Sequence, residues 1–422
     1  MHHFSYCNGV LHAEGVPVPH LADEVGTPFY CYSQATLARH FRVFADALAS
    51  LDATVCFAVK ANTNLSVIRS LVQQGAGCDV VSGGELQLAL KAGCAPEKIV
   101  FSGVGKTEAE LRLALDCGVG QINVESEAEL VTLSRLATTL GKTARIALRV
   151  NPDVDSGGHD KITTGRKEDK FGIEWTLAPA LYRKARDLPG IDPSGVAVHI
   201  GSQITSLAPF EAAFLRVRDL IHMLRADGLD IRHLDLGGGL GVPYDHRGAA
   251  PPSPAAYGEM VKRVFGNIGC SFTFEPGRVI VGNAGILVSR VVAIKESSTR
   301  RFVIIDAGMN DLVRPAMYGA LHEIIPVQEA PTSSTFEPVD VVGPVCETTD
   351  CFAKAYPLPA LKAGDLVAFM TAGAYGAAMS STYNARPLVP EVMVSGDKSS
   401  VIRRRPTFEE MTALEQLPSW MD

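Results

Sequence analysis

The stretch Val55-Cys56-Phe57-Ala58-Val59-Lys60-Ala61-Asn62 decides how this chain folds. Five apolar residues, several of which favour strands, run directly into a lysine, so the stretch predicts a buried strand with a cation at its carboxyl end. Partial desolvation there would favour the neutral amine of Lys60, which is the nucleophile that forms Schiff bases with aldehydes. A lysine that merely ends a strand and reaches solvent through its stem is the alternative on these residues alone.

Length and composition describe a soluble enzyme of two domains, because 422 residues are too many for one compact core. Apolar residues make up 46% and charged residues 20%, and the net charge of -7 offers no basic surface to nucleic acid or an anionic membrane. No apolar run reaches the length of a membrane span, and the N-terminus lacks a signal-peptide layout, so we expect a cytoplasmic protein. The nine cysteines are scattered without Cys-x-x-Cys spacing, which argues against disulfides and against a metal site.

Strand-like and helical segments alternate after the lysine strand. The apolar runs begin near Thr54, Gly77, Ile99, Gln121, Arg145, Gly195, His233 and Ser271. Three helix starts carry the capping-box pattern, and they are Ser82-x-x-Glu85, Thr107-x-x-Glu110 and Ser126-x-x-Glu129. Glycines that mark helix ends stand at Gly93, Gly118, Gly141 and Gly228. Eight such units over about 220 residues predict a closed (β/α)8 (TIM) barrel, with an open doubly wound sheet as the alternative.

The sequence pattern changes after Pro276, where short β-rich segments are separated by glycine and proline turns. These segments are Ile280–Lys295, Arg301–Asp306, Val339–Val345, Asp365–Met370 and Glu391–Ser395. We therefore expect a barrel over residues 28–276 and an all-β domain over 277–422. Residues 1–27 are expected to pack with the β domain, since the barrel does not need them.

A barrel of this type places its chemistry at the carboxyl ends of its strands. The polar groups expected there are Lys60, the Asp79–Ser82 region, Ser102, Glu125, Asn151, His199, Gly237-Gly238-Gly239 and Glu275. They predict a polar ring around one opening of the barrel.

Three motifs in that ring have both a chemical and a structural interpretation. Glycines at 237–239 could cradle a phosphate with their amides or could simply form a close-packed turn. Glu275 and Arg278 could bind a cationic ring nitrogen and an anion, or could pair with each other. His199 could stack on a planar cofactor or serve only in packing.

A lysine, a phosphate cradle, an acidic residue and a histidine at one barrel end describe a pyridoxal-phosphate (PLP) site. These motifs, together with Cys346-Glu347-Thr348-Thr349-Asp350 and Ala374-Tyr375-Gly376, resemble those of the alanine-racemase-fold PLP decarboxylases. The resemblance spans essentially the whole chain. It implies PLP as the cofactor and a C-terminal β domain that contributes to the site. It further implies decarboxylation of meso-diaminopimelate to L-lysine and CO2, the last step of bacterial-type lysine biosynthesis.

The resemblance also implies roles for the cofactor-binding residues. Lys60 would hold PLP covalently, and Glu275 would keep its ring nitrogen protonated, which favours decarboxylation over racemisation. The other positions expected to bind or line the cofactor are His199, Ser202, Gly237, Gly238, Gly239, Gly277, Arg278, Tyr375 and, as a lining residue only, Asp79.

Substrate-binding and catalytic roles are implied for the β domain. By the resemblance, the distal carboxylate of the substrate would be bound by Arg314 and Tyr318 together with Arg278, and Tyr375 would also line the substrate. The thiol of Cys346 would enter the partner subunit's site of a homodimer and return a proton after CO2 leaves.

The residue after Cys346 distinguishes two hypotheses about which amino acid is the substrate. Glu347 would pair with the ammonium at the far end of the substrate, whereas ornithine decarboxylases typically have aspartate there. A sister decarboxylase acting on ornithine, lysine or carboxynorspermidine is the enzymatic alternative, and a non-catalytic PLP binder is the other. Lys170-Phe171-Gly172 also matches the family, while Gly103-Val104 departs from the Gly-Asn of many relatives.

Overall fold

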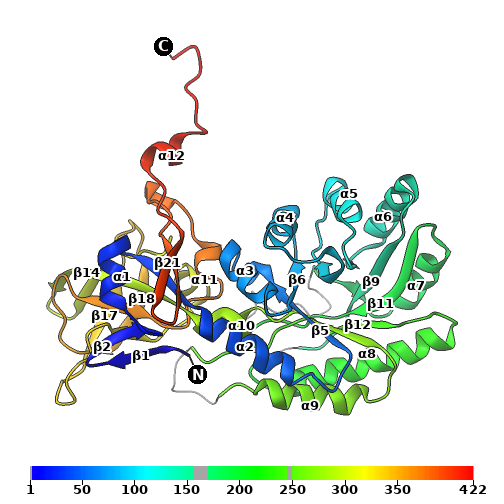
Figure 1. Cartoon of the computed structure of the whole chain (residues 1–422), viewed down its shortest axis with the longest axis horizontal. Coiled ribbons are helices and arrows are strands. Elements are labelled where there is room, and N and C mark those ends of the chain that lie inside the picture. The colour runs from blue at the N-terminus through cyan, green and yellow to red at the C-terminus, as the bar shows by residue number, and fades with distance from the viewer. Residues whose placement is uncertain (1, 156–169, 245–249, 422) are drawn as a thin grey trace. The chain divides into compact units, whose positions relative to one another are not determined.

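The computed structural model describes residues 2–155, 170–244 and 250–421 of the chain. It divides into two compact units, one formed by Leu37–Gly282 and the other by Met1–Thr36 together with Asn283–Asp422. Figure 1 shows the first unit as a ring of strands and helices and the second as a β-rich body. Among the described residues, no helix has both the length and the apolar character needed to cross a bilayer.

The first unit is a closed barrel of eight parallel strands. In chain order they are β5 (Ala53–Ala58), β6 (Gly77–Val80), β7 (Ile99–Phe101), β8 (Gln121–Val124), β9 (Ala144–Asn151), β11 (Ile191–Ala197), β12 (His233–Asp235) and β13 (Ser271–Phe274). Each strand pairs with the next, and β13 pairs back onto β5, so no strand edge remains. The barrel prediction is confirmed and the open-sheet alternative is wrong. A two-residue strand, β10 (Ile173–Glu174), adds to β9.

Helices follow the strands and cover the outside of the ring (Figure 1). They are α2 (Gln34–Asp46), α3 (Leu65–Val72), α4 (Gly83–Lys91), α5 (Glu108–Cys117), α6 (Glu127–Leu140), α7 (Ala178–Asp187), α8 (Ala208–Ala226), α9 (Pro254–Phe265) and the short α10 (Arg278–Val281). Two 3-10 turns, η1 (Val59–Ala61) and η2 (Pro96–Lys98), lie between them.

The three predicted helix starts are confirmed, but only one of the three capping boxes has both of the expected side-chain-to-backbone hydrogen bonds. Thr107 and Glu110 form a complete capping box at α5. At α4 the carboxylate of Glu85 instead accepts from the amide of Val81, one residue before the cap. The glutamate at the start of α6 reaches back in the same way, to the amide of Glu125. These glutamates therefore tie each helix start to the end of the preceding strand.

The second unit is built on a mixed sheet with the order β18-β17-β15-β14-β4-β20-β21, in which β19 also pairs with β14 and β16. Its strands are β1 (Phe4–Cys7), β2 (Val10–Ala13), β3 (Val16–Pro17), β4 (Phe29–Ser33), β14 (Gly285–Glu296), β15 (Arg301–Ile305), β16 (Ile324–Pro326), β17 (Glu337–Val342), β18 (Cys351–Leu358), β19 (Leu366–Phe369), β20 (Glu391–Ser395) and β21 (Lys398–Arg403). Its helical segments are α1 (Val18–Val25), η4 (Gly282–Ala284), α11 (Arg314–Tyr318), η5 (Ala377–Met379), η6 (Tyr383–Ala385) and α12 (Phe408–Thr412).

The unit boundaries differ from the expected ones at residues 28–36 and 277–282. The sequence analysis gave residues 28–36 to the barrel, but β4 pairs with β14 on one side and β20 on the other. All five residues of β4 are buried, so this strand is central to the β unit. Residues 277–282 stay with the barrel because α10 continues directly from its last strand.

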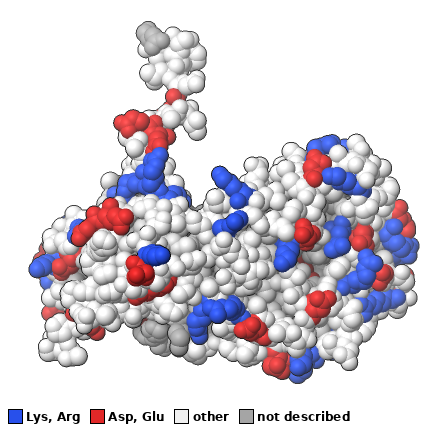
Figure 2. Space-filling view, in the orientation of Figure 1, with Lys and Arg blue, Asp and Glu red and all other residues white. Residues whose placement is uncertain are grey.

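The first 27 residues contribute to the core of the β unit. Side chains from β1, β2 and α1, such as Phe4, Leu11 and Leu21, form one buried cluster with Phe29 and Ile286. On the face drawn in Figure 2, basic and acidic side chains are interspersed over both units.

Candidate active site

Lys60 lies immediately after β5, in the turn η1, as the sequence predicted for the end of the lysine strand. Its Nζ forms an ion pair of 2.7 Å with Oδ2 of Asp79, at the end of the neighbouring strand β6. The Asp79 side chain is fully buried and that of Lys60 is 35% exposed. The ion pair favours the ammonium form of Lys60, which opposes the neutral amine expected from desolvation alone.

The other oxygen of Asp79, Oδ1, is buried without a hydrogen-bond partner among the described residues. A buried carboxylate oxygen that accepts no hydrogen bond destabilises the folded protein unless a bound group satisfies it. Asp79 is therefore the acidic group in direct contact with the Lys60 amine.

Glu275, at the end of β13, lies in a cluster of acidic side chains. Its Oε1 accepts from Ser102 at 3.4 Å, and the carboxyl of Asp235 lies close enough to affect its ionisation. Burial, followed by the negative charges of Asp235 and Asp79, raises the pKa of Glu275 well above its usual range. Burial also raises the pKa of Asp235. Burial and the neighbouring negative charge therefore disfavour the ionisation of Asp235 and Glu275 together.

Asp235 was not identified by the sequence analysis, and neither were the two barrel side chains that bind it. Its Oδ2 accepts from Nδ2 of Asn123 at 2.8 Å and from Nε2 of Gln121 at 3.1 Å. Its Oδ1 accepts from the amide of Gly237 at 3.0 Å. Gln121 and Asn123 are two residues apart in β8, so their side chains lie on the same face of the strand. This spacing of two polar residues is the sequence feature that could have identified them as side chains inside the barrel.

His199 follows β11 and contacts the glycine turn. The amide of Gly238 donates to Nδ1 of His199 at 3.2 Å, which leaves that nitrogen unprotonated. Burial, followed by the charges of Arg149 and Lys60, lowers the pKa of His199 well below its usual range. The ring is therefore a neutral imidazole with its proton on Nε2.

The glycines after β12 allow backbone segments to approach more closely than side chains would permit. An added Cβ would lie 2.6 Å from the carbonyl oxygen of Val198 at Gly237, and 2.5 Å from that of Gly201 at Gly239. At Gly238 it would lie 2.3 Å from the carbonyl oxygen of Glu275. The predicted cradle is thus close-packed. The amides of Gly237 and Gly238 donate within the protein, to Asp235 and His199.

Gly277 packs the end of the eighth strand against the lysine turn. A Cβ there would lie 2.9 Å from Cβ of Ala61 and 3.1 Å from Cβ of Ala58, and the amide of Ala58 donates to the carbonyl of Pro276. The turn that contains Gly277 and Arg278 therefore lies directly beside Lys60.

Arg278 is buried and its guanidinium is oriented by two hydroxyls. One nitrogen donates to Ser202 at 3.0 Å and another to the hydroxyl of Tyr244, whose ring also lies 5.7 Å from the guanidinium carbon. The structure thus brings together Arg278 and Ser202, which were predicted separately. Tyr244 was missed, and nothing in its local sequence distinguishes it from a surface tyrosine.

Glu125 joins two loops at the same end of the barrel. Its Oε1 accepts from the amide of Gly103 and from Arg149, and its Oε2 accepts from the amide of Gly172. The guanidinium of Arg149 also lies 5.0 Å from the ring of Phe171. The Gly103 loop is therefore anchored through its backbone rather than through the side chain that follows.

In the β unit, Arg314 begins the helix α11 and is only 5% exposed. Tyr318 ends the same helix and is partly exposed. Tyr375 has a positive φ of 55°, and the following Gly376 is required because a Cβ would lie 2.5 Å from the carbonyl oxygen of Ala372.

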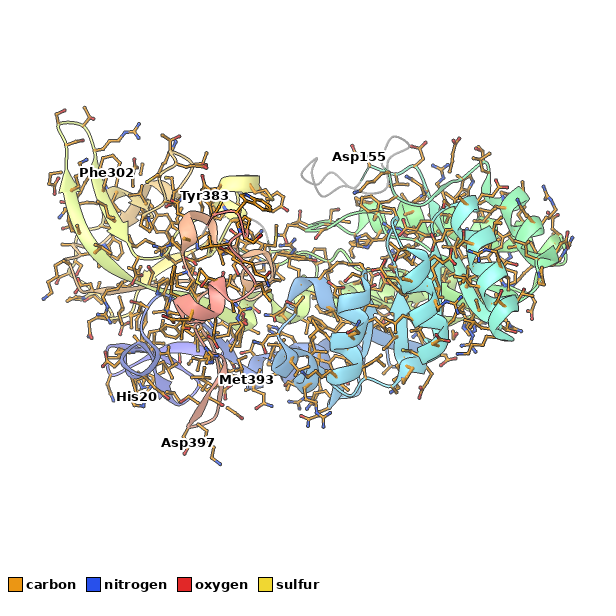
Figure 3. All side chains as sticks on the ribbon, turned by 90° about the horizontal axis from the view of Figure 1, so that it is seen from above. His20, Asp155, Phe302, Tyr383, Met393 and Asp397 are labelled. Carbon is orange, nitrogen blue, oxygen red and sulfur yellow. The ribbon has the colours of Figure 1, made fainter. Side chains whose placement is uncertain are left out.

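Cys346 and Glu347 are exposed on a loop that Asp350 stabilises. The carboxylate of Asp350 accepts from the amides of Val345 at 2.6 Å and of Met309 at 2.7 Å. Oε1 of Glu347 accepts from the hydroxyl of Tyr383 at 2.5 Å, and Tyr383 is labelled in Figure 3. The loop therefore presents a thiol and an adjacent oriented carboxylate to solvent.

PLP needs an amine for its aldehyde, an acidic partner for its ring nitrogen and tight backbone turns for its phosphate. The barrel provides all three at the carboxyl ends of its strands, with an unsatisfied buried oxygen on Asp79 and a close-packed glycine turn. Fold and site together define a PLP-dependent enzyme of the alanine-racemase fold.

Comparison with known proteins identifies the family. Residues 34–282 match the family described as "Pyridoxal-dependent decarboxylase, pyridoxal binding domain". The chain is 51% identical over 421 residues to diaminopimelate decarboxylase of Zymomonas mobilis, covering 99% of both chains. It superposes on diaminopimelate decarboxylase from M. jannaschii in complex with L-lysine with a TM-score of 0.94 at 34% identity, covering 99% of each chain. The Helicobacter pylori enzyme complexed with L-lysine gives 0.90 at 40% identity, covering 94% of this chain and 98% of that one.

The chain belongs to the diaminopimelate decarboxylases. Its cofactor is PLP and its reaction is that of a carboxy-lyase that produces lysine.

Proposed function

We propose that this chain decarboxylates meso-diaminopimelate to L-lysine and CO2 in the cytoplasm, as a homodimer whose subunits share active sites. PLP supplies an aldehyde that joins covalently to an amino group and a conjugated ring that takes up the electron pair left by departing CO2. The residues of the chain bind and orient the reactants and move the proton.

Barrel residues hold the cofactor in this proposal. Lys60 is the point of covalent attachment, and Asp79 controls its charge through the ion pair of 2.7 Å. Glu275 retains a proton at the ring nitrogen, supported by the negative charge of Asp235 beside it. His199 is assigned to the cofactor ring, and as a neutral imidazole it would not repel that proton.

In this proposal the phosphate is bound by those groups of the turns at 237–239 and 277–278 that are not already engaged within the protein. Gly239, Gly277 and Arg278 are assigned to it, with Tyr375 from the β unit. Gly237 and Gly238 shape the turn rather than donate, since their amides are already engaged. Ser202 orients Arg278, which we also assign to the substrate.

The observation that carries the substrate assignment is that the β unit contains a buried arginine and an exposed glutamate oriented by a hydrogen bond, two charges of opposite sign that suit a second amino-acid head. Arg314, a buried guanidinium, is assigned to the distal carboxylate with Tyr318 and Arg278. Glu347, oriented by Tyr383, is assigned to the distal ammonium. Ornithine and lysine lack the distal carboxylate, so a buried arginine would have no partner in them.

Cys346 is assigned the return of a proton to the carbon that loses CO2. A thiol suits this task if it is accessible, and Cys346 is exposed on its loop. We assign Cys346 and Glu347 to the active site of the partner subunit, which makes the dimer the functional form.

The test of the reaction is CO2 release by the purified, PLP-loaded protein, with Lys60→Ala as the blank. The substrates are meso-diaminopimelate, ornithine, lysine and carboxynorspermidine. Release from meso-diaminopimelate alone, with lysine as the product, supports the proposal. Release from a substrate that lacks the distal carboxylate would overturn the role of Arg314 and Glu347.

The shared site is tested by mixing two inactive proteins, Lys60→Ala and Cys346→Ala. Mixed dimers contain one site with both residues intact, so up to a quarter of the sites regain activity on random subunit exchange, as an order-of-magnitude expectation. Subunit exchange is verified separately with tagged chains. No recovery despite exchange would show that each site is built from one subunit.

A further inference from the structure

Three buried polar side chains meet inside the barrel, Gln121 and Asn123 from β8 and Asp235 from β12. Their exposed fractions are 6%, 2% and 1%. The strands β8 and β12 are not neighbours in the ring, so the contacts between these side chains cross the interior. Branched apolar residues usually fill the interior of such a barrel, so polar groups placed there must satisfy one another.

The side-chain amides of Gln121 and Asn123 use every N–H that they have. Nε2 of Gln121 donates to Oδ1 of Asn123 at 2.8 Å and to Oδ2 of Asp235 at 3.1 Å. Nδ2 of Asn123 donates to the same carboxylate oxygen at 2.8 Å and to Oγ of Ser102 at 3.0 Å. Turning either amide over would place its oxygen against that carboxylate oxygen, so the network fixes the orientation of both.

This arrangement gives Asp235 more hydrogen-bond donors than Glu275. Asp235 accepts from three N–H groups, because the amide of Gly237 also donates to its Oδ1 at 3.0 Å. Within the described part of the chain, Glu275 accepts only from the hydroxyl of Ser102, at 3.4 Å. Burial raises the pKa of both carboxyls, but hydrogen bonds oppose this rise at Asp235, whereas neighbouring negative charges add to it at Glu275. Asp235 is therefore the better anion of the two and Glu275 the better acid.

The other ionisable groups around Glu275 leave this division unchanged. Asp79 is negative, but its Oδ2 lies 2.7 Å from Nζ of Lys60, and the two charges act on Glu275 in opposite directions. Cys56 on β5 and Tyr257 on α9 are neutral at pH 7, because burial raises the pKa of each. The acidic neighbour on β12 is therefore the charge that most affects the ionisation of Glu275.

We propose that Gln121 and Asn123 are positioning residues that hold Asp235 as the anion, so that Glu275 carries the proton of the two carboxyls before the cofactor binds. The inference rests on the proposed function, in which Glu275 faces the ring nitrogen of PLP. That contact needs one proton between the carboxyl and the nitrogen. The protein already holds this proton on Glu275, so none has to be taken from solvent when the ring binds.

Infrared spectroscopy of the cofactor-free protein shows which carboxyl carries the proton. A protonated carboxyl has a C=O stretching band that its anion lacks, and labelling glutamate alone with carbon-13 shifts only the glutamate bands. Subtracting the spectrum of Glu275→Gln removes other buried acids, such as Glu85, whose pKa burial raises to about 7. We expect a protonated glutamate band at pH 7 that Glu275→Gln lacks.

Two variants, Asn123→Leu and Gln121→Met, each remove two N–H donors from the network with little change in volume. In each, the ratio of proton on Glu275 to proton on Asp235 should fall about tenfold, the effect typical of losing a hydrogen bond to a charged group. The glutamate band should weaken, and a band that shifts on labelling aspartate should appear.

The matched control is Tyr182→Phe. Its buried hydroxyl donates to the carbonyl of Gly195 at 2.6 Å in the same unit, so the variant also loses a buried hydrogen bond, but none from the amide network. Tyr182→Phe should therefore leave the glutamate band unchanged, which separates loss of a particular donor from general destabilisation.

A second readout compares PLP with an analogue that has C–H in place of the ring nitrogen. The aldehyde and the phosphate are the same in both, so attachment at Lys60 cancels from the ratio of their Kd values. The ratio is measured at a pH at which the ring nitrogen of free PLP carries no proton. Asn123→Leu should lower the preference for PLP about tenfold, and Tyr182→Phe should not change it.

The results distinguish the two proposals. If the unchanged protein binds PLP no more tightly than the analogue, the assignment of Glu275 to the ring nitrogen fails, and the role of the amide pair toward the cofactor fails with it. If PLP is preferred but the protonated band belongs to aspartate in the unchanged protein, or stays on Glu275 in both amide variants, only the positioning role is overturned. If Asn123→Leu does not fold, Gln121→Met provides the comparison, since it keeps both N–H groups of Asn123.

Discussion

Replacing Gly238 by alanine tests whether the glycine turn is close-packed in the way the structure indicates. Gly238 does not have a left-handed backbone, so alanine meets no conformational strain there. Its only obstacle is contact, because the new Cβ would lie 2.3 Å from the carbonyl oxygen of Glu275 and 3.1 Å from its carbonyl carbon. Both are backbone atoms, so no side-chain rotation relieves the overlap.

The size of the effect follows from these distances. Cβ atoms rarely approach a heavy atom more closely than 3.0 Å, so the two backbone segments must separate by at least about 0.7 Å. Overpacking of this kind typically costs about 1–3 kcal/mol of folding stability. Glu275 would move with its backbone, and a displacement of about 1 Å at a reacting site can lower the rate about 100-fold.

The matched control is Gly84→Ala, in the helix α4. Its added Cβ would meet nothing closer than Oγ of Ser82 at 3.7 Å, so we expect no loss and a gain of up to about 1 kcal/mol from helix propensity. Both variants are compared by urea unfolding of the cofactor-free protein, by titration with PLP and by CO2 release.

Gly238→Ala should be less stable than Gly84→Ala by about 1–3 kcal/mol, bind PLP at least about tenfold more weakly and lose most of its activity. If Gly238→Ala instead unfolds and binds PLP like the control, the turn has room for a side chain. The reasoning from the close approach of Gly238 to Glu275 would then be refuted.

Three further predictions concern charge and cofactor. Asp79→Asn removes the ion-pair partner of Lys60, so the rate of covalent attachment of PLP at a fixed neutral pH, followed by absorbance, should rise because the ammonium loses its anionic neighbour; an unchanged rate would exclude control by the ion pair. Burial raises the pKa of Asp311 from 3.8 to about 6, so the folded protein binds this proton more tightly than the unfolded chain and loses stability as pH rises through this range. Relative to Asp311→Asn, the free energy of unfolding of the unchanged protein should therefore fall by about 3 kcal/mol between pH 3 and pH 7, and a constant difference would contradict the shift. Removing PLP should lower the free energy of unfolding by about 2.7 kcal/mol relative to protein that is held at a PLP concentration of 100 times Kd, measured by thermal unfolding. Lys60→Ala should show a much smaller change at the same PLP concentration, and equal changes would argue against attachment at Lys60.

The sequence by itself determined the barrel and the identity of its principal chemical groups. Most barrel strands are short apolar runs and several helices have a local start or stop signal, so the alternation could be read without knowledge of distant contacts. Lys60 and Glu275 were found because a barrel gathers strand ends at one opening. The family resemblance then added roles for Arg314, Cys346 and Glu347 that no local pattern contained.

Only the tertiary structure decided which side chains meet. Asp235 contacts Asn123 across more than 100 residues of chain, and its pairing with Glu275 depends on both strands facing the same interior. The same is true of β4, whose apolar sequence suits a barrel strand or a β-unit strand equally until its neighbours are known.

The Arg314–His322 contact shows the physical reason for this division. The two residues are eight apart, close enough to be compared in the sequence, yet the ring is oriented by a carbonyl 48 positions further along. Local periodicity encodes which elements form, because it reflects burial along one segment. Hydrogen-bond partners and protonation states depend on strand pairing, which joins segments that the sequence keeps apart.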